Sequence, residues 1–158
     1  MTFPAIELLR MRYLRGPNVW TYRPVIEAWV DLGPLEDHPS NTLPGFVDRL
    51  TAWLPGMIEH RCGVGERGGF IQRLHEGTWC GHIMEHVAIE LQTLAGMQVG
   101  FGKARETSQR GVYKVVIRTR QEEVGRESMV AARDLVMAAI HGTAFDVKGT
   151  VNRLKAMV

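Results

Sequence analysis

The sequence predicts an α+β domain, a small and largely antiparallel sheet of about four strands with helices packed on one face. Some short segments alternate hydrophobic and polar residues, as strands do, whereas others repeat hydrophobic residues with a helical period. Turn residues, mainly glycine and proline, separate these segments. The chain of 158 residues has no repeat, low-complexity tract or second-domain linker, so residues 1–158 are expected to form one domain.

The first two elements are candidate strands. Residues 5–14 alternate in part and lead into the turn sequence Gly16-Pro17-Asn18, and residues 25–32 end at Gly33-Pro34. We expect these strands to pair as a hairpin with a long connection.

Helical periodicity begins after Asn41 and Thr42. Residues 44–54 place their large hydrophobic side chains on one helical face, which predicts a short amphipathic helix. Residues 57–69 are rich in glycine and predict a surface loop. Residues 70–75 predict one or two helical turns that lead into the next helix.

A longer helix is predicted over residues 79–95, which are rich in helix formers and contain no proline. Thr78 is expected to be its N-cap, and Gly96 is expected to end it. The next strands are predicted over residues 97–103 and 112–120, separated by a polar turn at 106–111. Helices over residues 124–141 and 147–157 complete the chain.

The helix over residues 79–95 contains the sequence His82-Ile-Met-Glu85-His86, which has the pattern H-x-x-E-H. On a helix, His82 and His86 lie one turn apart on one face, and at this spacing two imidazoles can hold one zinc ion. Glu85 is then the candidate general base. The pattern inverts the H-E-x-x-H motif of metalloproteases, so it predicts metal-assisted hydrolysis.

The sequence leaves the identity of the third metal ligand undecided. Glu90 lies one turn after His86 and is our first choice, although a stripe of this spacing turns by about 80° around the helix over two turns. His60 and Cys62, from the predicted loop, are alternatives because both residue types bind zinc. Either residue could instead be structural, His60 as a hydrogen-bonding group and Cys62 as a small buried side chain.

Composition narrows the class of protein. Hydrophobic residues make up 45% and charged residues 23%, as in ordinary globular proteins, and the net charge of +2 does not indicate a nucleic-acid binder. There is no apolar run of about 18 residues and no signal peptide, so we expect no membrane association and a cytoplasmic location. The two cysteines are too few for a disulfide framework and are expected to be reduced.

Several sequence blocks occur in an order that carries a resemblance to a known family. They are Leu14-Arg15-Gly16-Pro17-Asn18 with Trp20, Pro44-Gly45-Phe46, Glu59-His60-Arg61-Cys62, Gly68-Gly69-Phe70, Glu76-Gly77-Thr78-Trp79, Gly81 to Gln92, and Val99-Gly100-Phe101-Gly102 with Arg105-Glu106-Thr107. With these blocks, which span nearly all of the chain, the sequence resembles the N-terminal domain of cyanophycin synthetase.

The resemblance implies a polymer substrate. Family members make cyanophycin, a poly-aspartate chain whose side-chain carboxylates each carry an arginine, with an ATP-grasp module and a Mur-ligase-like module that follow this domain. The domain is then expected to grip the polymer and present its end to these modules, in a homo-oligomeric full-length enzyme. In some members it also cleaves the polymer to make primers, and by that resemblance His82 and His86 are metal ligands and Glu85 is the base.

Neither ligase module is expected within these residues. The chain contains no G-x-x-x-x-G-K phosphate loop, so we expect no ATP site here. We expect the chain to be an excised N-terminal domain or a stand-alone relative.

A substrate with guanidinium and carboxylate groups calls for both signs of charge around the site. Candidate residues are the acids Glu59, Glu66, Glu76 and Glu106 and the cations Arg61, Lys103 and Arg105. Arg105 and Glu106 stand out because they lie in one of the blocks above. The functions that remain open are a zinc-dependent peptidase of the polymer, a non-catalytic tether and, as a weaker third, an oligomerisation domain. Glu85 distinguishes the first two, because a tether needs no base.

Overall fold

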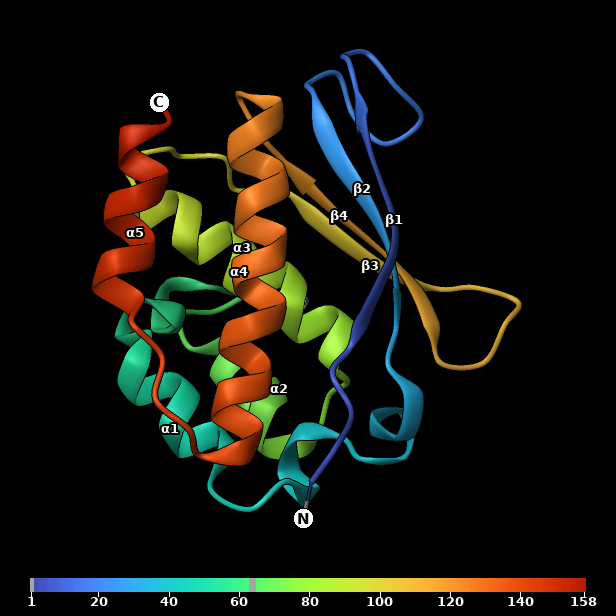
Figure 1. Cartoon of the computed structure of the whole chain (residues 1–158), viewed down its shortest axis with the longest axis vertical. Coiled ribbons are helices and arrows are strands. Elements are labelled where there is room, and N and C mark those ends of the chain that lie inside the picture. Colours follow the sequence, from blue (N-terminus) through green and yellow to red (C-terminus); the bar gives the residue numbers. More distant parts are fainter. Residues whose placement is uncertain (1, 63–64) are drawn as a thin grey trace.

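The computed structural model describes residues 2–62 and 65–158 and confirms the α+β prediction. Its strands are β1 (Glu7–Leu14), β2 (Val25–Asp31), β3 (Gly102–Glu106) and β4 (Val112–Arg118). They form one antiparallel sheet in the order β1-β2-β4-β3. Figure 1 shows the long helices gathered on one side of this sheet, so the sheet has a covered face and an open face.

The helices are α1 (Phe46–Trp53), α2 (Gly69–Glu76), α3 (Cys80–Leu94), α4 (Glu122–His141) and α5 (Val147–Ala156). Helices α3 and α4 contact each other and pack on the sheet, α3 against β3 and β4 and α4 against β2. Helices α1 and α5 contact α4. None of the described helices is long and apolar enough to cross a membrane.

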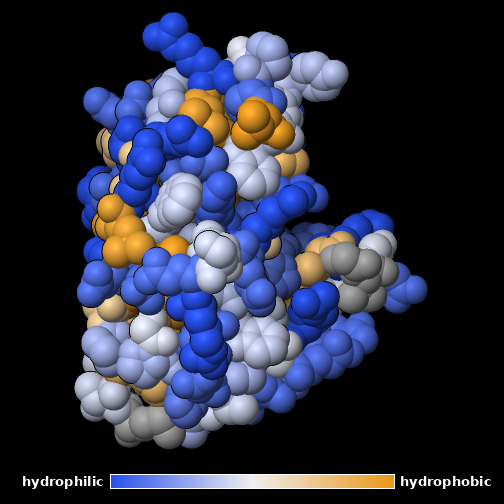
Figure 2. Space-filling model, turned by 90° about the vertical axis from the view of Figure 1, so that its right-hand side faces the viewer, coloured by the Kyte–Doolittle hydropathy of each residue, from blue (hydrophilic) through white to orange (hydrophobic). Residues whose placement is uncertain are grey.

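The strand register assigns side chains to the two faces of the sheet. Ile26, Ala28 and Val30 of β2 pair with residues of β4 that point to the same side, and all are buried against the helices. The intervening residues, among them Trp29 and Lys114, point to the open face. In Figure 2 the side of the molecule that carries the sheet, on the right in Figure 1, faces the viewer. Its surface is mostly hydrophilic, and the hydrophobic residues on it form small patches that do not join.

Glu27 is an ionisable residue buried on the open face, with 1% of its surface exposed. Its carboxylate accepts hydrogen bonds from Arg12 Nε at 2.7 Å, Trp20 Nε1 at 2.9 Å and Trp29 Nε1 at 3.3 Å. Burial acts to raise the pKa of Glu27, but these hydrogen bonds outweigh burial and the pKa is lowered. The carboxylate thereby ties the connection between β1 and β2, which contains Trp20, to the sheet.

Helix α3 is buried along most of its length because it lies between the sheet and the other helices. The buried residues include Glu85, His86 and Glu90, which are 7%, 7% and 4% exposed. Ionisable side chains are costly to bury unless they are paired or bind a ligand. The polar groups of α3 therefore need partners within the fold.

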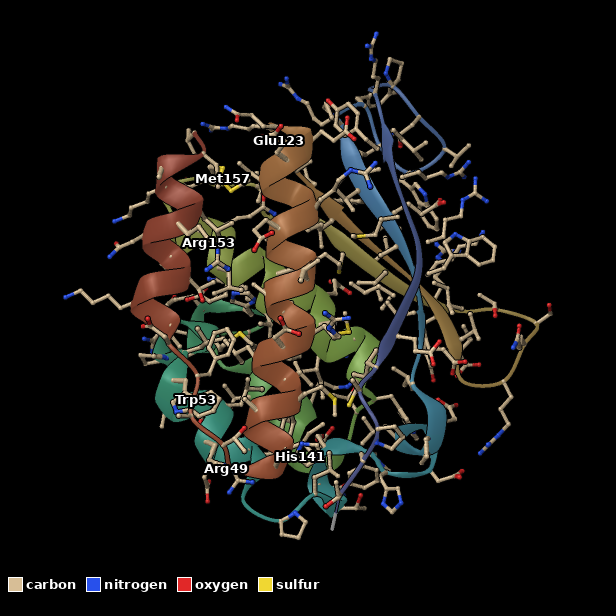
Figure 3. The ribbon with its side chains drawn as sticks, viewed as in Figure 1. Arg49, Trp53, Glu123, His141, Arg153 and Met157 are labelled. Atoms are coloured by element: carbon tan, nitrogen blue, oxygen red, sulfur yellow. The ribbon has the colours of Figure 1, made fainter. Side chains whose placement is uncertain are left out.

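The C-terminal end of α4 is hydrogen-bonded to a side chain of α1. Arg49 donates hydrogen bonds to the carbonyl oxygens of Ala139 at 2.6 Å and Ile140 at 3.3 Å, in the last turn of α4. These carbonyls have no partner within a helix that ends at His141. Figure 3 shows Arg49 beside His141 at this end.

Two predictions about local structure are wrong. The strand predicted over residues 97–103 begins only at Gly102, because Gly96 and Gly100 turn the backbone with φ of 93° and 29°. Met97 and Val99 are hydrophobic because they fill the core rather than because they pair in the sheet. Thr78 is not the N-cap of α3, since Trp79 holds that position without a side-chain hydrogen bond.

The loop predicted over residues 57–69 is only partly irregular. A 3₁₀ turn spans Pro55–Glu59, and the segment is joined across its ends by hydrogen bonds from Gly68 N to Ile58 O and from Phe70 N to His60 O. Residues 63–64 lie outside the described residues. The two bonds bring His60 back toward the helices.

Candidate metal centre

The first turns of α3 bring the rings of His82 and His86 together. The two Nε2 atoms are 3.0 Å apart, and the ring centroids are 4.7 Å apart with an angle of 77° between the planes. This follows from their spacing of four residues, which places both side chains on one face of the helix.

Cys62 joins the two histidines from the segment before α2. Its Sγ lies 3.2 Å from Nε2 of His82, and the donor atoms of Cys62, His82 and His86 all lie within 4.8 Å of one another. The backbone of Cys62 has φ of 52°, in the left-handed region that side chains other than glycine rarely adopt. Such strain is concentrated at functional sites in proteins, where the surrounding structure imposes it.

The ring nitrogens that face away from this cluster also have partners. Nδ1 of His82 lies 2.8 Å from Oγ1 of Thr78, and Nδ1 of His86 lies 2.9 Å from Nδ1 of His60. On the other side of its ring, Nε2 of His60 lies 3.0 Å from Oε1 of Glu90. Metal-binding histidines commonly have their second nitrogen held in this way.

The series of hydrogen bonds from Glu90 through His60 to His86 determines which ring nitrogen of His60 and of His86 carries the proton when both rings are neutral. An ionised carboxylate only accepts, so Nε2 of His60 donates to Glu90 and Nδ1 of His60 accepts from Nδ1 of His86. The remaining nitrogen of His86, Nε2, then carries a lone pair directed at His82. This is the form of histidine that binds a metal ion.

Phe70 holds both rings from the side. Its ring stacks on His86 with centroids 3.9 Å apart and planes at 17°, and it meets His82 edge-on at 5.5 Å. Phe70 itself is fully buried at the start of α2. The two imidazoles are therefore fixed by packing as well as by hydrogen bonds.

Burial sets the charges of the cluster. It lowers the pKa of His82 to about 4, with a further contribution from the charge of Arg73. It lowers the pKa of His86 to about 2, and the charge of Arg73, like that of His82 or His60 when either is protonated, acts in the same direction. Both imidazoles are accordingly neutral near pH 7.

Glu85 lies beside the two histidines. Its Oε2 is 3.7 Å from Nε2 of His86. Burial raises the pKa of Glu85 to about 7, although the charge of Lys103 acts to lower it. A carboxylate with a pKa near neutrality is suited to take up and release a proton.

A pocket of about 820 Å³ opens over this cluster. Cys62, His82, Glu85, His86 and Glu90 line it, together with residues of β3 and of the segment before α2. Of the residues predicted to bind substrate, Lys103, Glu59 and Arg61 line the pocket. Glu59 also forms an ion pair with Arg67, at 2.8 Å.

The other predicted substrate residues lie farther along β3. The guanidinium of Arg105 is 5.5 Å from the centre of the Trp20 ring, and Glu106 is exposed at the end of the strand. Neither residue is among the described residues that line the pocket.

The sequence did not show how Glu90 and His60 are connected. Glu90 remains a predicted ligand, but its carboxylate contacts His60 in this structure and is not in the group formed by Cys62 and the α3 histidines. His60 and Phe70 both occur in sequence blocks that carried the family resemblance, and this was the available signal for them.

Comparison with known proteins identifies the family. Residues 27–141 match the cyanophycin synthase-like N-terminal domain. The chain is 45% identical over 145 residues to the cyanophycin synthetase of Crocosphaera subtropica, a match that covers 90% of this chain and 17% of that protein. It is 49% identical over 123 residues to that of Geminocystis herdmanii, covering 77% of this chain and 14% of the relative. It is 48% identical over 129 residues to that of a Synechocystis species, covering 80% and 15%.

This chain therefore spans about one sixth of the length of the curated relatives that it matches. The matches cover most of the chain, including all of α3 and the pocket residues of β3. The chain belongs to the family of cyanophycin synthase-like N-terminal domains.

Proposed function

We propose that this domain binds the cyanophycin chain and cleaves its aspartate backbone at a zinc centre held by His82, His86 and Cys62. The observation that carries the proposal is the convergence of three donor atoms, within 4.8 Å of one another, in the lining of a pocket of about 820 Å³. Glu85, a buried carboxyl group beside them, is the proposed base.

The donor set fits zinc. Two imidazole nitrogens and a cysteine sulfur are ligands that zinc prefers, and three protein ligands leave one position open in a tetrahedral site. The hydrogen bonds from His60 and Thr78 hold the outer nitrogens of both rings, so that the inner ones can face the ion. This geometry favours Cys62 over Glu90 as the third ligand.

When bound, zinc would supply a Lewis acid that lowers the pKa of a coordinated water and polarises the scissile carbonyl. Glu85 accepts a proton from the attacking water and passes it to the leaving nitrogen. The water oxygen bonds to the carbonyl carbon and the carbon–nitrogen bond breaks, which leaves a new carboxyl end and a new amino end.

Charged residues that line the pocket suit this substrate. Lys103 and Arg61 can hold carboxylates, and Glu59 can pair with a guanidinium if it releases Arg67. These groups favour polymer binding whether or not cleavage follows. A non-catalytic tether, which raises the local concentration of the chain for ligase modules, is therefore the second candidate.

A role in a longer protein is suggested by the relatives, which are cyanophycin synthetases of which the matched part of this chain covers 17% and 14%. In such a protein we infer that cleavage makes new chain ends for an ATP-grasp module and a Mur-ligase-like module to extend. The domain would also keep the polymer near those modules.

Polymer length tests the proposal directly. The purified domain is incubated with cyanophycin as prepared, with a chelator, and with zinc restored after chelation, and chain length is followed on a gel. Shortening that is lost with the chelator and regained with zinc would support a metallohydrolase. If the polymer keeps its length but still binds to the domain, the non-catalytic tether remains as the function.

A further inference from the structure

Strand β3 is an edge of the sheet and also a wall of the pocket. In the order β1-β2-β4-β3 it pairs with β4 on one side, and no described strand lies on its other side. Gly100, Gly102, Lys103 and Ala104 line the pocket. The free edge of the sheet therefore borders the space above the candidate metal centre.

The pairing with β4 shows which backbone groups of β3 remain free. Phe101 accepts a hydrogen bond from Arg118 N, and Thr107 donates one to Val112 O. Because alternate residues of an antiparallel strand bond to the same neighbour, Lys103 and Arg105 also bond to β4. Gly102 and Ala104 direct their N–H and C=O groups to the free edge.

The same edge approaches the proposed base. A Cβ atom on Gly102 would lie 2.6 Å from Cγ and 2.8 Å from Oε2 of Glu85, so the glycine lets this carboxylate pack directly on the strand. Glu85 also lies within 3.7 Å of His86. A chain held along the edge at Gly102 would thus lie beside both the base and the candidate ligands.

We infer that the substrate backbone binds as an added strand on the free edge of β3, paired with Gly102 and Ala104. Extended peptides bind exposed sheet edges in this way, with backbone hydrogen bonds supplying affinity and alternate side chains supplying specificity. The inference rests on the proposed function, because it identifies how the polymer lies in the same site.

The charged residues on the two faces of β3 indicate which kind of polypeptide would bind along its edge. Side chains of an added strand that lie opposite Lys103 and Arg105 share the open face with those two cations. On the other face, the substrate side chains enter the pocket beside Glu85. The occupant is therefore an extended polypeptide whose alternate side chains present carboxylates to these cations, and a polymer whose side-chain arginines each carry a carboxylate and a guanidinium can do so through the carboxylates.

Amide hydrogen exchange, followed by NMR, tests this inference. The zinc-loaded Glu85→Gln domain, which should bind without cleaving, is labelled with nitrogen-15 and compared with and without soluble cyanophycin. Exchange of the Gly102 and Ala104 amides should slow by about tenfold or more as each gains a hydrogen bond. The Lys103 and Arg105 amides, already bonded to β4, are internal controls and should change little.

The outcomes separate this inference from the proposed function. Polymer binding with unchanged exchange at Gly102 and Ala104 would overturn edge pairing, whereas cleavage by the unmodified domain would still stand. Slowed exchange together with no cleavage by the unmodified domain would support edge pairing in a tether. Absence of any binding by either form would overturn both.

Discussion

Oε1 of Glu90 lies 3.0 Å from Nε2 of His60, on the opposite side of that ring from His86. The acid thus acts on His86 through a second imidazole. Glu90 is buried, with 4% of its surface exposed, and this contact gives its charge a hydrogen-bonding partner. A network that requires one tautomer of His86 gives the buried acid a function without making it a ligand.

Replacing Glu90 with glutamine should weaken zinc binding. The amide no longer enforces donation by His60, so His86 loses its fixed tautomer, and affinity should fall by about tenfold to hundredfold. Competition with a chelating dye measures the dissociation constant. Glu123→Gln, at an exposed glutamate at the start of α4 (Figure 3), is the control. Unchanged affinity would contradict the network, and a loss as complete as in His82→Ala would make Glu90 a ligand.

Cobalt can identify the sulfur ligand. Cobalt-loaded protein should show the sulfur-to-metal charge-transfer band in the near ultraviolet, and Cys62→Ser should remove it because Cys62 supplies the only thiol at the cluster among the described residues. Cys80→Ser is the matched control, since Cys80 is fully buried and burial raises the pKa of its thiol to about 12. A band that survives in Cys62→Ser would exclude Cys62 as a ligand.

Gly102→Ala should reduce cleavage without removing zinc. The added Cβ would lie within 2.8 Å of both Glu85 Oε2 and Ile89 Cδ1, so the carboxylate must move. Displacement of a catalytic group by about 1 Å can cost about a hundredfold in rate. Rate and zinc content are measured on the same samples. Full activity in this variant would show that Glu85 does not depend on its close approach to β3.

We expect Glu27 to make the free energy of unfolding depend on pH in the acidic range. Its pKa is lowered in the folded state, so the stabilisation is present above its ordinary pKa and is lost as the pH falls through the folded value. Glu27→Gln should lower the free energy of unfolding by about 1–3 kcal/mol at neutral pH, and the difference from the unmodified protein should shrink as the pH falls below the ordinary glutamate pKa of 4.5.

Urea unfolding across this pH range measures the effect of Glu27→Gln. Glu7→Gln, at an exposed glutamate on β1, is the control on the same sheet. A difference between Glu27→Gln and the unmodified protein that stays constant with pH would show that the charge of Glu27 does not stabilise the fold.

The fold could be predicted where the pattern is local. Alternation along β2 and β4 and the helical period of α4 follow from which side chains face the core, and the predicted elements lie close to the observed ones. The segment around Met97 and Val99 could not be predicted in this way. Its residues are as buried as those of a strand, but glycines at 96 and 100 set a different backbone path.

For the candidate site too, local sequence predicts some contacts and not others. Helical spacing alone places His82 beside His86, because both lie on one helix. Cys62 and His60 reach them across 20 and 26 residues, and that contact depends on how the segment before α2 packs on Phe70. The sequence could therefore propose Glu90, His60 and Cys62 as third ligands, with Glu90 first, but it could not show that Cys62 is the one that lies with the two histidines.

The central claim is that Glu85 is the base of a zinc-dependent hydrolysis. The measurement that tests it most directly compares cyanophycin cleavage by the unmodified domain and by Glu85→Gln, with equal zinc content verified in each sample. Loss of a general base should slow cleavage by about a hundredfold to ten-thousandfold, with folding unchanged. New amino ends should accumulate with the unmodified domain and not with Glu85→Gln. Equal cleavage by the two proteins, or none by the zinc-loaded unmodified domain, would contradict the claim.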